Sequence, residues 1–356
     1  DDMKTLKYVL GSLDDLLEFY SSFPRMNLQP TDKGLKITDD DKGWFSPNYI
    51  NFKYRLKSRK LILPWLFAIA RSIALIDGIR KHDWLRRRAG ILESVTTEYY
   101  FSILKNLLKI VASSNKFYKI ETTDFTTNSR DLLKDMIATA EKNGLEIFTK
   151  NELLEIKNSN NNIIANCSND NFQAKNMVVC LGDEIEKFSD LKINKSYAPI
   201  AVVKNIKADT KSFVELDCFK KNCINIVTKG KSFGLIGGIS LSKKDEVQKY
   251  FDFMINEHKK LNPGIEILEK YIGVKNEIFQ KKENRNYLFH INPSRKYKNV
   301  WSVIPGKFTL VFSMAPEFYR IVYKKNPRKF FNTSSDTGNF FHLIEETVWG
   351  EIQKKE

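Results

Sequence analysis

Two segments of the chain place apolar residues at intervals of three and four, which is the spacing of an amphipathic helix. The first segment begins at Ser129, a residue type that caps helix N-termini, and stops at Asn143 and Gly144, which favour a helix end. The apolar residues on its predicted face are Leu132, Leu133, Met136, Ile137 and Ala140. This pattern predicts a helix that packs on a sheet.

The second amphipathic segment runs over residues 245–260 and is stopped by the turn-forming residues 262–264. Its apolar side carries Val247, Tyr250, Phe251, Met254, Ile255 and His258. Because His258 falls on this apolar side, we interpret it as a packed side chain rather than a catalytic one.

Short apolar runs bounded by turn-forming residues predict strands elsewhere in the chain. Runs at 145–148, 153–156 and 163–167 are separated by Asn-rich turns, and a further run at 177–181 ends at Gly182. The order is therefore helix, strand, hairpin and strand. Three later runs predict a second sheet, at 199–203, 224–227 and 233–238.

The run at 303–305 breaks at Gly306 and Lys307 and continues as the start of a helix. A strand that ends in glycine at a helix N-terminus presents free backbone N–H groups and a positive dipole end, which suit a phosphate or an electron-rich cofactor ring. The strand that ends at Gly182 forms a junction of the same kind. In nucleotide-binding folds a small antiparallel meander often precedes such a parallel strand, so we expect Leu153 near the adenine end of a cofactor.

The length of 356 residues exceeds what one hydrophobic core usually serves, which favours two interleaved or sequential domains. No apolar run reaches the roughly 18 residues that span a bilayer, and the first residues do not form a signal peptide. The cysteines show no C-x-x-C pair and no zinc-finger spacing with histidine. We therefore expect buried, reduced thiols rather than disulfides or a metal site, and a cytoplasmic protein.

The net charge of +15 favours anionic partners. The lysines are scattered, however, and no aromatic-basic RNA motif, zinc finger or helix-turn-helix is recognisable, so we expect no nucleic-acid partner. The segment 61–88 is the most unusual in composition, because apolar residues there lie between cationic clusters. It is either an interfacial membrane helix or a core helix with solvated basic ends, and Arg71 and Asp77 argue against a spanning helix.

The order of these features resembles that of the FAD-dependent oxidoreductases of the D-amino-acid oxidase superfamily. The resemblance covers residues 125–320 and rests on the helix after Ser129, the meander, the strand to Gly182, the second sheet with Gly237 and Gly238, and the Gly306 junction. The chain looks closest to the glycerol-3-phosphate dehydrogenase-like and D-amino-acid dehydrogenase-like branches. In those branches a glycine-containing turn similar to residues 306–309 meets the flavin.

The resemblance implies a mixed α/β fold, of the α+β kind. An N-terminally incomplete, Rossmann-like FAD-binding domain is expected to be interleaved with an antiparallel-sheet substrate domain. The expected regions are a helical and partly basic N-terminal region (1–124), an FAD-binding part with the β-meander (125–190), the substrate domain (191–295), the return to the FAD-binding domain (296–325) and a peripheral tail (326–356).

By the same resemblance the cofactor is FAD. The backbone that faces its isoalloxazine ring and ribityl chain is expected at Gly306, Lys307, Phe308, Thr309 and Leu310. Gly182 is expected to approach the FAD, and the substrate to lie over the flavin on the face of the second sheet.

One feature departs from the superfamily, whose members begin with a strand, G-x-G-x-x-G and a helix. The first 33 residues here contain a single glycine, Gly11, and the side chains around it, with Asp14 and Asp15, would block and repel a pyrophosphate. We expect either that the sequence begins downstream of the true start, as Asp1 in place of Met indicates, or that the protein is a divergent relative that no longer holds FAD tightly.

Candidate catalytic residues lie upstream of the Gly306 junction, about where superfamily members carry an arginine for the substrate anion. Arg285 can hold a carboxylate or phosphate through two hydrogen bonds, and Tyr287 or His290 can donate a hydrogen bond or act as a base. The alternative is a surface ion pair for Arg285 and a buried strand for Tyr287 and His290. Tyr271 and Lys275 are further pocket candidates with the same alternatives.

Two functions follow from the sequence. The first is an FAD-dependent dehydrogenase or oxidase that transfers a hydride to flavin N5 from the C–H next to an amine or hydroxyl. Its substrate is a small anionic amino acid, hydroxy acid or polyol phosphate, and its acceptor can be a quinone if the protein lies peripherally on the inner face of the membrane. The second is a cofactor-free scaffold or truncated fragment whose basic segment 57–88 contacts a membrane or an acidic partner.

Overall fold

The protein is described from a computed structural model. It describes the following residues: 15, 26–31, 34–39, 45–47, 50–55, 118–122, 125–127, 129–159, 162–207, 210, 212–217, 222–229, 232–278, 289–327 and 340–355. In these ranges no helix is long and apolar enough to cross a membrane.

Segments far apart in the sequence form two compact units. Unit 1 contains residues 1–22, 138–196 and 274–334, and unit 2 contains residues 23–137, 197–273 and 335–356. Each unit is discontinuous, and the domain limits expected from the sequence remain a prediction.

The larger sheet carries the core of unit 2. Its strand order is β15-β11-β14-β13-β12-β4-β5 among the described residues, and its pairs are antiparallel between β11, β14, β13 and β12 and parallel between β12 and β4. Its strands are β4 (Ile50–Arg55), β5 (Tyr118–Thr122), β11 (Ile193–Lys204), β12 (Phe213–Asp217), β13 (Asn222–Lys229), β14 (Phe233–Gly238) and β15 (Glu266–Ile278). The predicted second sheet is confirmed, because the runs at 199–203, 224–227 and 233–238 lie in the neighbouring strands β11, β13 and β14.

A second, smaller sheet belongs to the same unit. Its strand order is β1-β2-β3-β6, and all of its pairs are antiparallel. Its strands are β1 (Met26–Thr31), β2 (Gly34–Asp39), β3 (Phe45–Pro47) and β6 (Phe125–Thr127).

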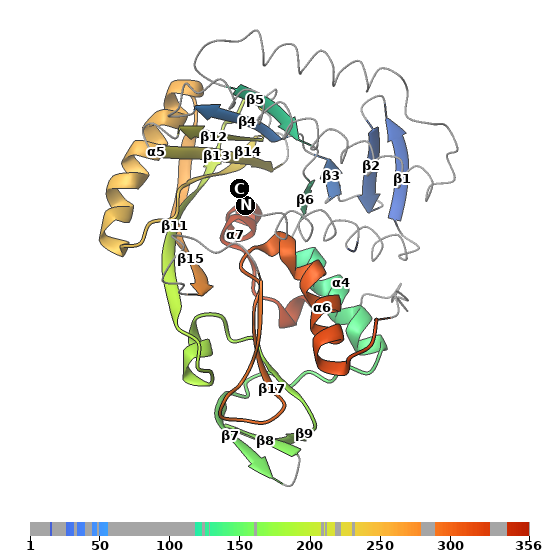
Figure 1. The fold of residues 1–356 in the computed structure, drawn as a ribbon. Coiled ribbons are helices and arrows are strands. Elements are labelled where there is room, and N and C mark those ends of the chain that lie inside the picture. The colour runs from blue at the N-terminus through green and yellow to red at the C-terminus, as the bar shows by residue number, and fades with distance from the viewer. Residues whose placement is uncertain are drawn as a thin grey trace, which may run out of the picture. The chain divides into compact units, whose positions relative to one another are not determined.

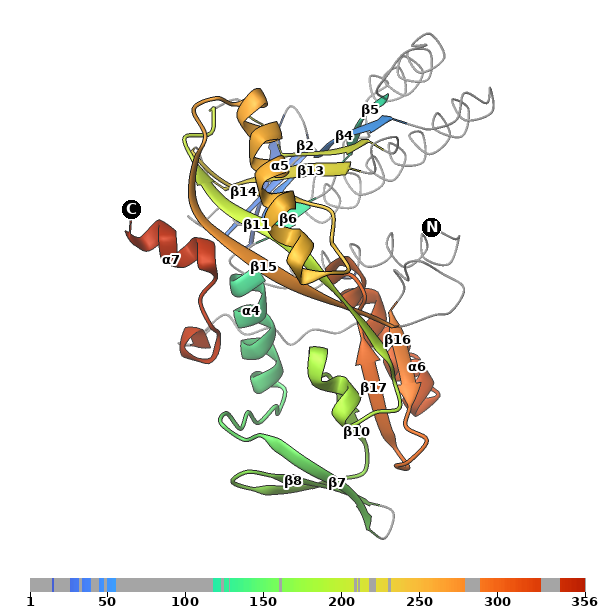
Figure 2. The same ribbon diagram turned by 90° about the vertical axis from the view of Figure 1, so that its left-hand side faces the viewer.

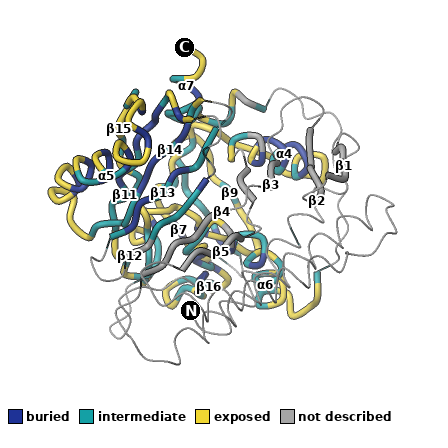
Figure 3. The backbone as a smooth tube through the Cα atoms, turned by 90° about the horizontal axis from the view of Figure 1, so that it is seen from above, coloured by how far each residue is buried: buried dark blue, intermediate teal, exposed yellow. Residues whose placement is uncertain are grey.

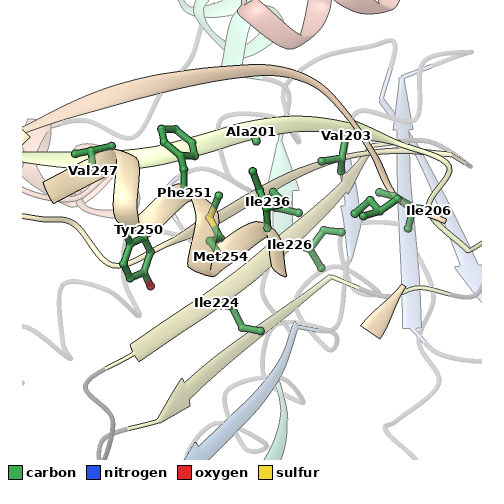
Figure 4. Packing of buried hydrophobic residues seen from close by; sticks show 12 residues of the cluster. Ala201, Val203, Ile206, Ile224, Ile226, Ile236, Val247, Tyr250, Phe251 and Met254 are labelled. Carbon is green, nitrogen blue, oxygen red and sulfur yellow. The ribbon is translucent and has the colours of Figure 1, made fainter. Parts of the chain in front are cut away.

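Helix α5 (Val247–Leu261) follows the short η2 (Lys244–Glu246) and covers the larger sheet (Figures 1 and 2). Its buried residues are the six that the sequence predicts: Val247, Tyr250, Phe251, Met254, Ile255 and His258. They pack against Ala201, Ile226 and Ile236 of the sheet, as Figure 4 shows for part of this cluster. In Figure 3 one side of the helix is accordingly buried and the other exposed.

Unit 1 contains two three-stranded sheets. The first has the order β10-β17-β16, with β10 parallel to β17 and β17 antiparallel to β16, and the second is the meander β7-β8-β9. Their strands are β7 (Leu153–Ser159), β8 (Asn162–Cys167), β9 (Asn171–Ala174), β10 (Met177–Val179), β16 (His290–Pro293) and β17 (Val300–Ile304). Ile156 and Ile163 of the meander form one core with Val179, Val300 and Ile304 of the first sheet.

Helix α4 (Ser129–Lys142) confirms the first predicted helix, and it ends at Gly144, whose φ is 94°. Its predicted apolar face is partly wrong. Leu133 is 46% exposed, whereas Asp135 and Thr139 are buried together with Leu132. The buried face is therefore rotated from the one that apolar residues alone define, because polar side chains also face inward here.

The predicted strand at 145–148 is wrong. These residues form no strand, and Leu145, Ile147 and Phe148 are exposed. The meander accounts for the difference, because β7 pairs only with β8 among the described strands and leaves this segment without a ladder partner. Phe148 instead packs its ring against Phe172, with the ring centroids 4.7 Å apart.

The C-terminal segment belongs to unit 2 and contains η4 (Phe340–Leu343) and α7 (Val348–Lys355). The Glu346 carboxylate forms an ion pair with the Arg130 guanidinium, with 3.3 Å between Oε2 and Nη1. The ammonium group of Lys229 lies over the ring of Trp349. This segment is therefore joined both to the first turn of α4 and to the end of β13.

Candidate functional site

The parallel strands β10 and β17 end at the same edge of their sheet. Val178 pairs with Trp301 and Val179 with Ser302, so the residues that follow each strand lie side by side. Ligands of parallel α/β sheets bind outside the carboxyl ends of the strands. We call residues 180–182 and 305–307 the carboxyl edge.

Gly182 forms the first turn of the carboxyl edge. Its φ of 56° is a left-handed conformation that favours glycine. Within the described part of the chain, a Cβ atom placed on Gly182 would meet only Asn276 Nδ2, at 3.9 Å, so the backbone there is open to close approach. Together these properties are those of a turn that lets a flat group lie against the main chain.

The short helix η1 (Gly182–Lys187) continues from this turn and brings two carboxylates with it, Asp183 and Glu184. Lys195 donates a hydrogen bond to Asp183 at 3.1 Å, and this bond lowers the pKa of the Asp183 carboxyl. Lys187 pairs with Glu184 at 2.8 Å. Each carboxylate near the glycine turn is therefore paired with a lysine, so the two carboxylates add no net charge there that would repel a phosphate.

Gly306 forms the second turn, with a φ of 68°. The Lys307 N–H donates to the Pro305 carbonyl at 2.7 Å and closes the turn. The chain then enters η3 (Phe308–Leu310) and continues directly into α6 (Val311–Tyr323). A positively charged lysine and the positive end of a helix dipole therefore lie together at this edge, and both attract electron-rich groups.

Helix α6 is held against the sheet on one side. Leu310 is fully buried, and Phe318 packs edge-on against Trp301 of β17, with the ring centroids 6.3 Å apart. Figure 2 shows α6 alongside β16 and β17. Phe308 is 53% exposed and is free of this packing, so the first helical turn presents one buried anchor and one exposed aromatic ring.

The structure brings most of the predicted site residues of unit 1 to this edge. His290 begins β16 and pairs with Ile304, the last residue of β17, so it lies beside the Gly306 turn, half-buried. Leu153 begins β7 and packs against the cluster that contains Val179 and Ile304, the last residues of β10 and β17. The backbone of Thr309 belongs to η3.

The remaining candidates are placed differently. Arg285 and Tyr287 lie outside the described residues. Tyr271 and Lys275 both lie on β15, which the sequence does not predict as a strand. Tyr271 is half-buried, and burial raises the pKa of its hydroxyl, whereas Lys275 is exposed. The basic segment 57–88 is also outside the described residues.

Asn276 is a residue that the sequence does not single out. It lies on β15 in unit 1, and its amide is the group nearest to an added side chain at Gly182. Its Oδ1 atom is buried and has no hydrogen-bond partner among the described residues. The available signal is weak: Asn276 stands two residues before Ile278, which packs on the core, so both face the same side of the strand.

One hollow in unit 1 is separate from this edge. An open hollow of about 640 Å³ is lined by Glu186, Ser189 and Asp190 with the adjoining residues 191–194, and by none of the glycine turns. Among the described residues, no three His, Cys, Asp or Glu side chains are grouped so that they could hold a metal ion. The expectation of buried thiols is right for Cys223 and wrong for Cys180, which is exposed because it follows the end of β10 at the carboxyl edge.

The sequence matches no protein-family model, and no curated protein matches it. Solved structures do share its fold. L-proline dehydrogenase from P. horikoshii aligns over 92% of this chain and 80% of its own, at 11% identity and a TM-score of 0.53. Glycine oxidase from Geobacillus kaustophilus aligns over 91% of this chain and 80% of its own, also at 11% identity and a TM-score of 0.53. The chain therefore has the mixed α/β fold, with antiparallel sheets, that these two structures have, as the sequence predicts.

Proposed function

We propose that the protein is an FAD-dependent oxidoreductase that acts on a small anionic substrate. The observation that carries the proposal is the pair of left-handed glycine turns, Gly182 and Gly306, at the adjacent carboxyl ends of β10 and β17. Two such turns at one sheet edge leave the main chain uncovered where a dinucleotide cofactor binds in folds of this kind.

The residues at the edge fit FAD in three respects. The Gly182 backbone is open, α6 directs the positive end of its dipole toward the Gly306 turn, and the Asn276 amide directs its Nδ2 atom, a hydrogen-bond donor, toward the Gly182 turn. FAD, when bound, supplies the hydride acceptor. The glycine turns admit the cofactor, and Lys307 and the start of the helix favour electron density beside them.

The substrate would be held by side chains rather than by backbone. Arg285 is proposed to bind the substrate carboxylate or phosphate through two hydrogen bonds. His290, which the register places at the carboxyl edge, and Tyr287 are proposed to accept or donate the proton of the substrate amine or hydroxyl. An amino acid is the substrate class we favour, because proline and glycine are the substrates in the names of the two similar structures.

The proposal is tested by FAD binding to the purified full chain, followed through the visible absorption spectrum and the quenching of flavin fluorescence. Gly182→Ala should weaken FAD binding at least tenfold, since a methyl group would occupy the surface on which the cofactor lies. Gly144→Ala is the matched control. Gly144 also has a positive φ, of 94°, but no atom lies within 4 Å of its added Cβ and it ends α4.

Each result separates two functions. FAD binding by the wild type and by Gly144→Ala, but not by Gly182→Ala, supports the flavoenzyme, and bleaching of the bound flavin by amino acids without oxygen then identifies the substrate. A wild-type chain that binds no FAD at any concentration tested refutes the proposal in favour of the cofactor-free scaffold.

A further inference from the structure

Helix α6 is apolar on two opposite sides. Its inner side packs on the small sheet of unit 1, where Ser313 is buried and Phe318 lies edge-on against Trp301 of β17 (Figure 2). With about 3.6 residues per turn, the opposite side of the helix carries apolar and aromatic residues and no charge. We call this opposite side the outer face of α6, and it consists of Phe312, Ala315, Pro316, Tyr319 and Tyr323.

The outer face is largely in contact with solvent. Tyr319 is 38% exposed and Tyr323 is 47% exposed, and Ala315 is exposed as well. The two tyrosine rings pack against each other, with their centroids 4.8 Å apart. A helix that is apolar on both sides is usually covered on both sides, because exposed apolar area costs free energy in water. The outer face therefore has the composition of a contact surface.

Cations gather where the outer face ends. Lys324 and Lys325 directly follow α6, both are exposed, and neither forms an ion pair in the part of the chain that the structure describes. Arg320, in the last turn of the helix, pairs with Glu317 at 2.9 Å. Between Glu317 and Asp336 the sequence carries no acidic residue and five cations: Arg320, Lys324, Lys325, Arg328 and Lys329. This end of the helix is therefore positively charged.

A partner for this surface has to offer apolar contacts and negative charge together. The interface of a bilayer with anionic lipids offers both, because lysine reaches the headgroup phosphates while apolar side chains enter the acyl boundary. Tyrosine is enriched at this depth of a membrane. Single-stranded nucleic acid also combines charge with rings, but its bases stack on separate aromatic faces. The rings of Tyr319 and Tyr323 are instead packed on each other, which favours the bilayer.

We propose that the outer face of α6 is a docking surface for a membrane that contains anionic lipids. The helix has 13 residues and is thus roughly 20 Å long, and it would lie in the plane of the interface. Tyr319 and Tyr323 would enter the headgroup region, and Lys324 and Lys325 would contact the phosphates. The inference is independent of the proposed function, because no cofactor takes part in the contact.

The experiment measures co-sedimentation of the full chain with two kinds of vesicle. One kind contains phosphatidylcholine alone, and the other contains phosphatidylcholine mixed with phosphatidylserine. The first variant removes the free charges by Lys324→Gln with Lys325→Gln. The second removes the exposed rings by Tyr319→Ser with Tyr323→Ser. The urea midpoint of each variant reports whether its fold is kept.

Each variant has a matched control. Lys249→Gln with Lys259→Gln removes the same charge from two exposed lysines of α5. Phe148→Ser with Leu154→Ser removes two apolar side chains that are 53% and 59% exposed elsewhere in unit 1. A general effect of charge or of surface hydrophobicity would appear in these controls as strongly as in the α6 variants.

We expect the wild type to bind the vesicles with phosphatidylserine and to bind phosphatidylcholine alone far more weakly. Loss of the two lysine charges should weaken binding to the anionic vesicles about 20- to 30-fold, and added salt should weaken wild-type binding in the same direction. Loss of the two rings should weaken it about tenfold, because the apolar contact is removed. Both controls should bind as the wild type does.

Three results would overturn the inference. A wild-type chain that binds neither kind of vesicle refutes it. Vesicle binding that is equally strong in the wild type and in both α6 variants shows that another surface makes the contact. A wild-type dimer in sedimentation velocity that the Tyr319→Ser, Tyr323→Ser variant cannot form, without vesicle binding, assigns the outer face to a second copy of the chain. A failure to bind FAD would refute the proposed function alone and leave this inference standing.

Discussion

His258 is a buried titratable group whose protonation should limit the acid stability of unit 2. It lies on the apolar side of α5 and is 2% exposed, and its Nε2 atom has no hydrogen-bond partner among the described residues. Burial lowers the pKa of His258 from 6.5 to about 4, because the imidazolium would lose its hydration in the core. A hydrogen bond to the backbone of Asn225 and the charge of Glu257 act in the opposite direction and are smaller.

The sign of the effect follows from the two protonation states. The unfolded chain binds a proton at His258 near pH 6.5, whereas the folded protein binds it only near pH 4. Between these values the unfolded state carries more protons, so stability falls as the pH falls. Above pH 6.5 the protonation of His258 takes nothing from the free energy of unfolding. At pH 5 it lowers the free energy of unfolding by about 2 kcal/mol, and at lower pH this reduction approaches about 3 kcal/mol.

The perturbation that isolates this effect is His258→Phe. Phenylalanine keeps a ring beside Phe213, whose centroid lies 5.8 Å from that of His258, but it cannot titrate. In urea unfolding at pH 7.5 and pH 5, the variant should lose about 2 kcal/mol less stability between the two pH values than the wild type. The reasoning is refuted if the wild type and His258→Phe lose the same free energy.

Phe251→Leu is the control for this comparison. Phe251 is buried on the same helix, 3% exposed, and carries no ionisable group. Its substitution should lower stability by about 1 kcal/mol at both pH values and leave the difference between them as it is in the wild type.

Two further predictions concern packing and unpaired polar groups. Gly238→Ala should destabilise the protein by about 1–3 kcal/mol in urea unfolding, because the new Cβ would overlap the Tyr250 ring and lie 2.8 Å from the Cys223 carbonyl oxygen. Gly264→Ala, whose nearest neighbour would be 4.0 Å away, should leave the urea midpoint almost unchanged, and equal losses in the two variants would contradict the steric argument. Ser302→Ala should be neutral or stabilise by about 1 kcal/mol, because the buried Ser302 hydroxyl has no described partner. Ser212→Ala should instead cost about 1 kcal/mol, since its Oγ accepts the Thr228 N–H at 3.1 Å, and a larger loss for Ser302 than for Ser212 would show that the Ser302 hydroxyl is satisfied in solution.

The parts of the fold that the sequence predicts are those whose burial follows a local period. All six predicted apolar positions of α5 are buried, because the helix covers one face of a sheet and exposes the other face. The strands β13 and β14 are predicted for a similar reason, since they lie inside the larger sheet and are rich in apolar residues.

The elements that the sequence misses lack this local signal. β15 is the last strand in the order of its sheet among the described residues, and its exposed positions carry charged residues such as Glu269 and Lys270, which hide the strand. The run at 145–148 fails in the opposite sense, because its apolar residues indicate a strand although no neighbouring strand pairs with it. Strand pairing is a tertiary property, so apolar composition alone does not determine it.

The candidate site divides in the same way. Gly182 and Gly306 can be predicted, because a glycine at the end of an apolar run indicates a turn that other residues adopt at a cost. The position of Asn276 beside Gly182 cannot be predicted, because it depends on which turn the amide meets in the folded chain. The residues next to Asn276 in the sequence do not indicate that contact.

This division has a consequence for how such a site changes between proteins. In the function proposed above, cofactor contacts made by the main chain need only a glycine and the strand ends, so they would persist while most side chains change. Contacts made by side chains, such as those proposed for Arg285 and His290, can be replaced one at a time without moving the sheet. We therefore expect substitutions at the glycine turns to weaken cofactor binding at least tenfold, and substitutions at the side chains to change affinity and substrate choice in smaller steps.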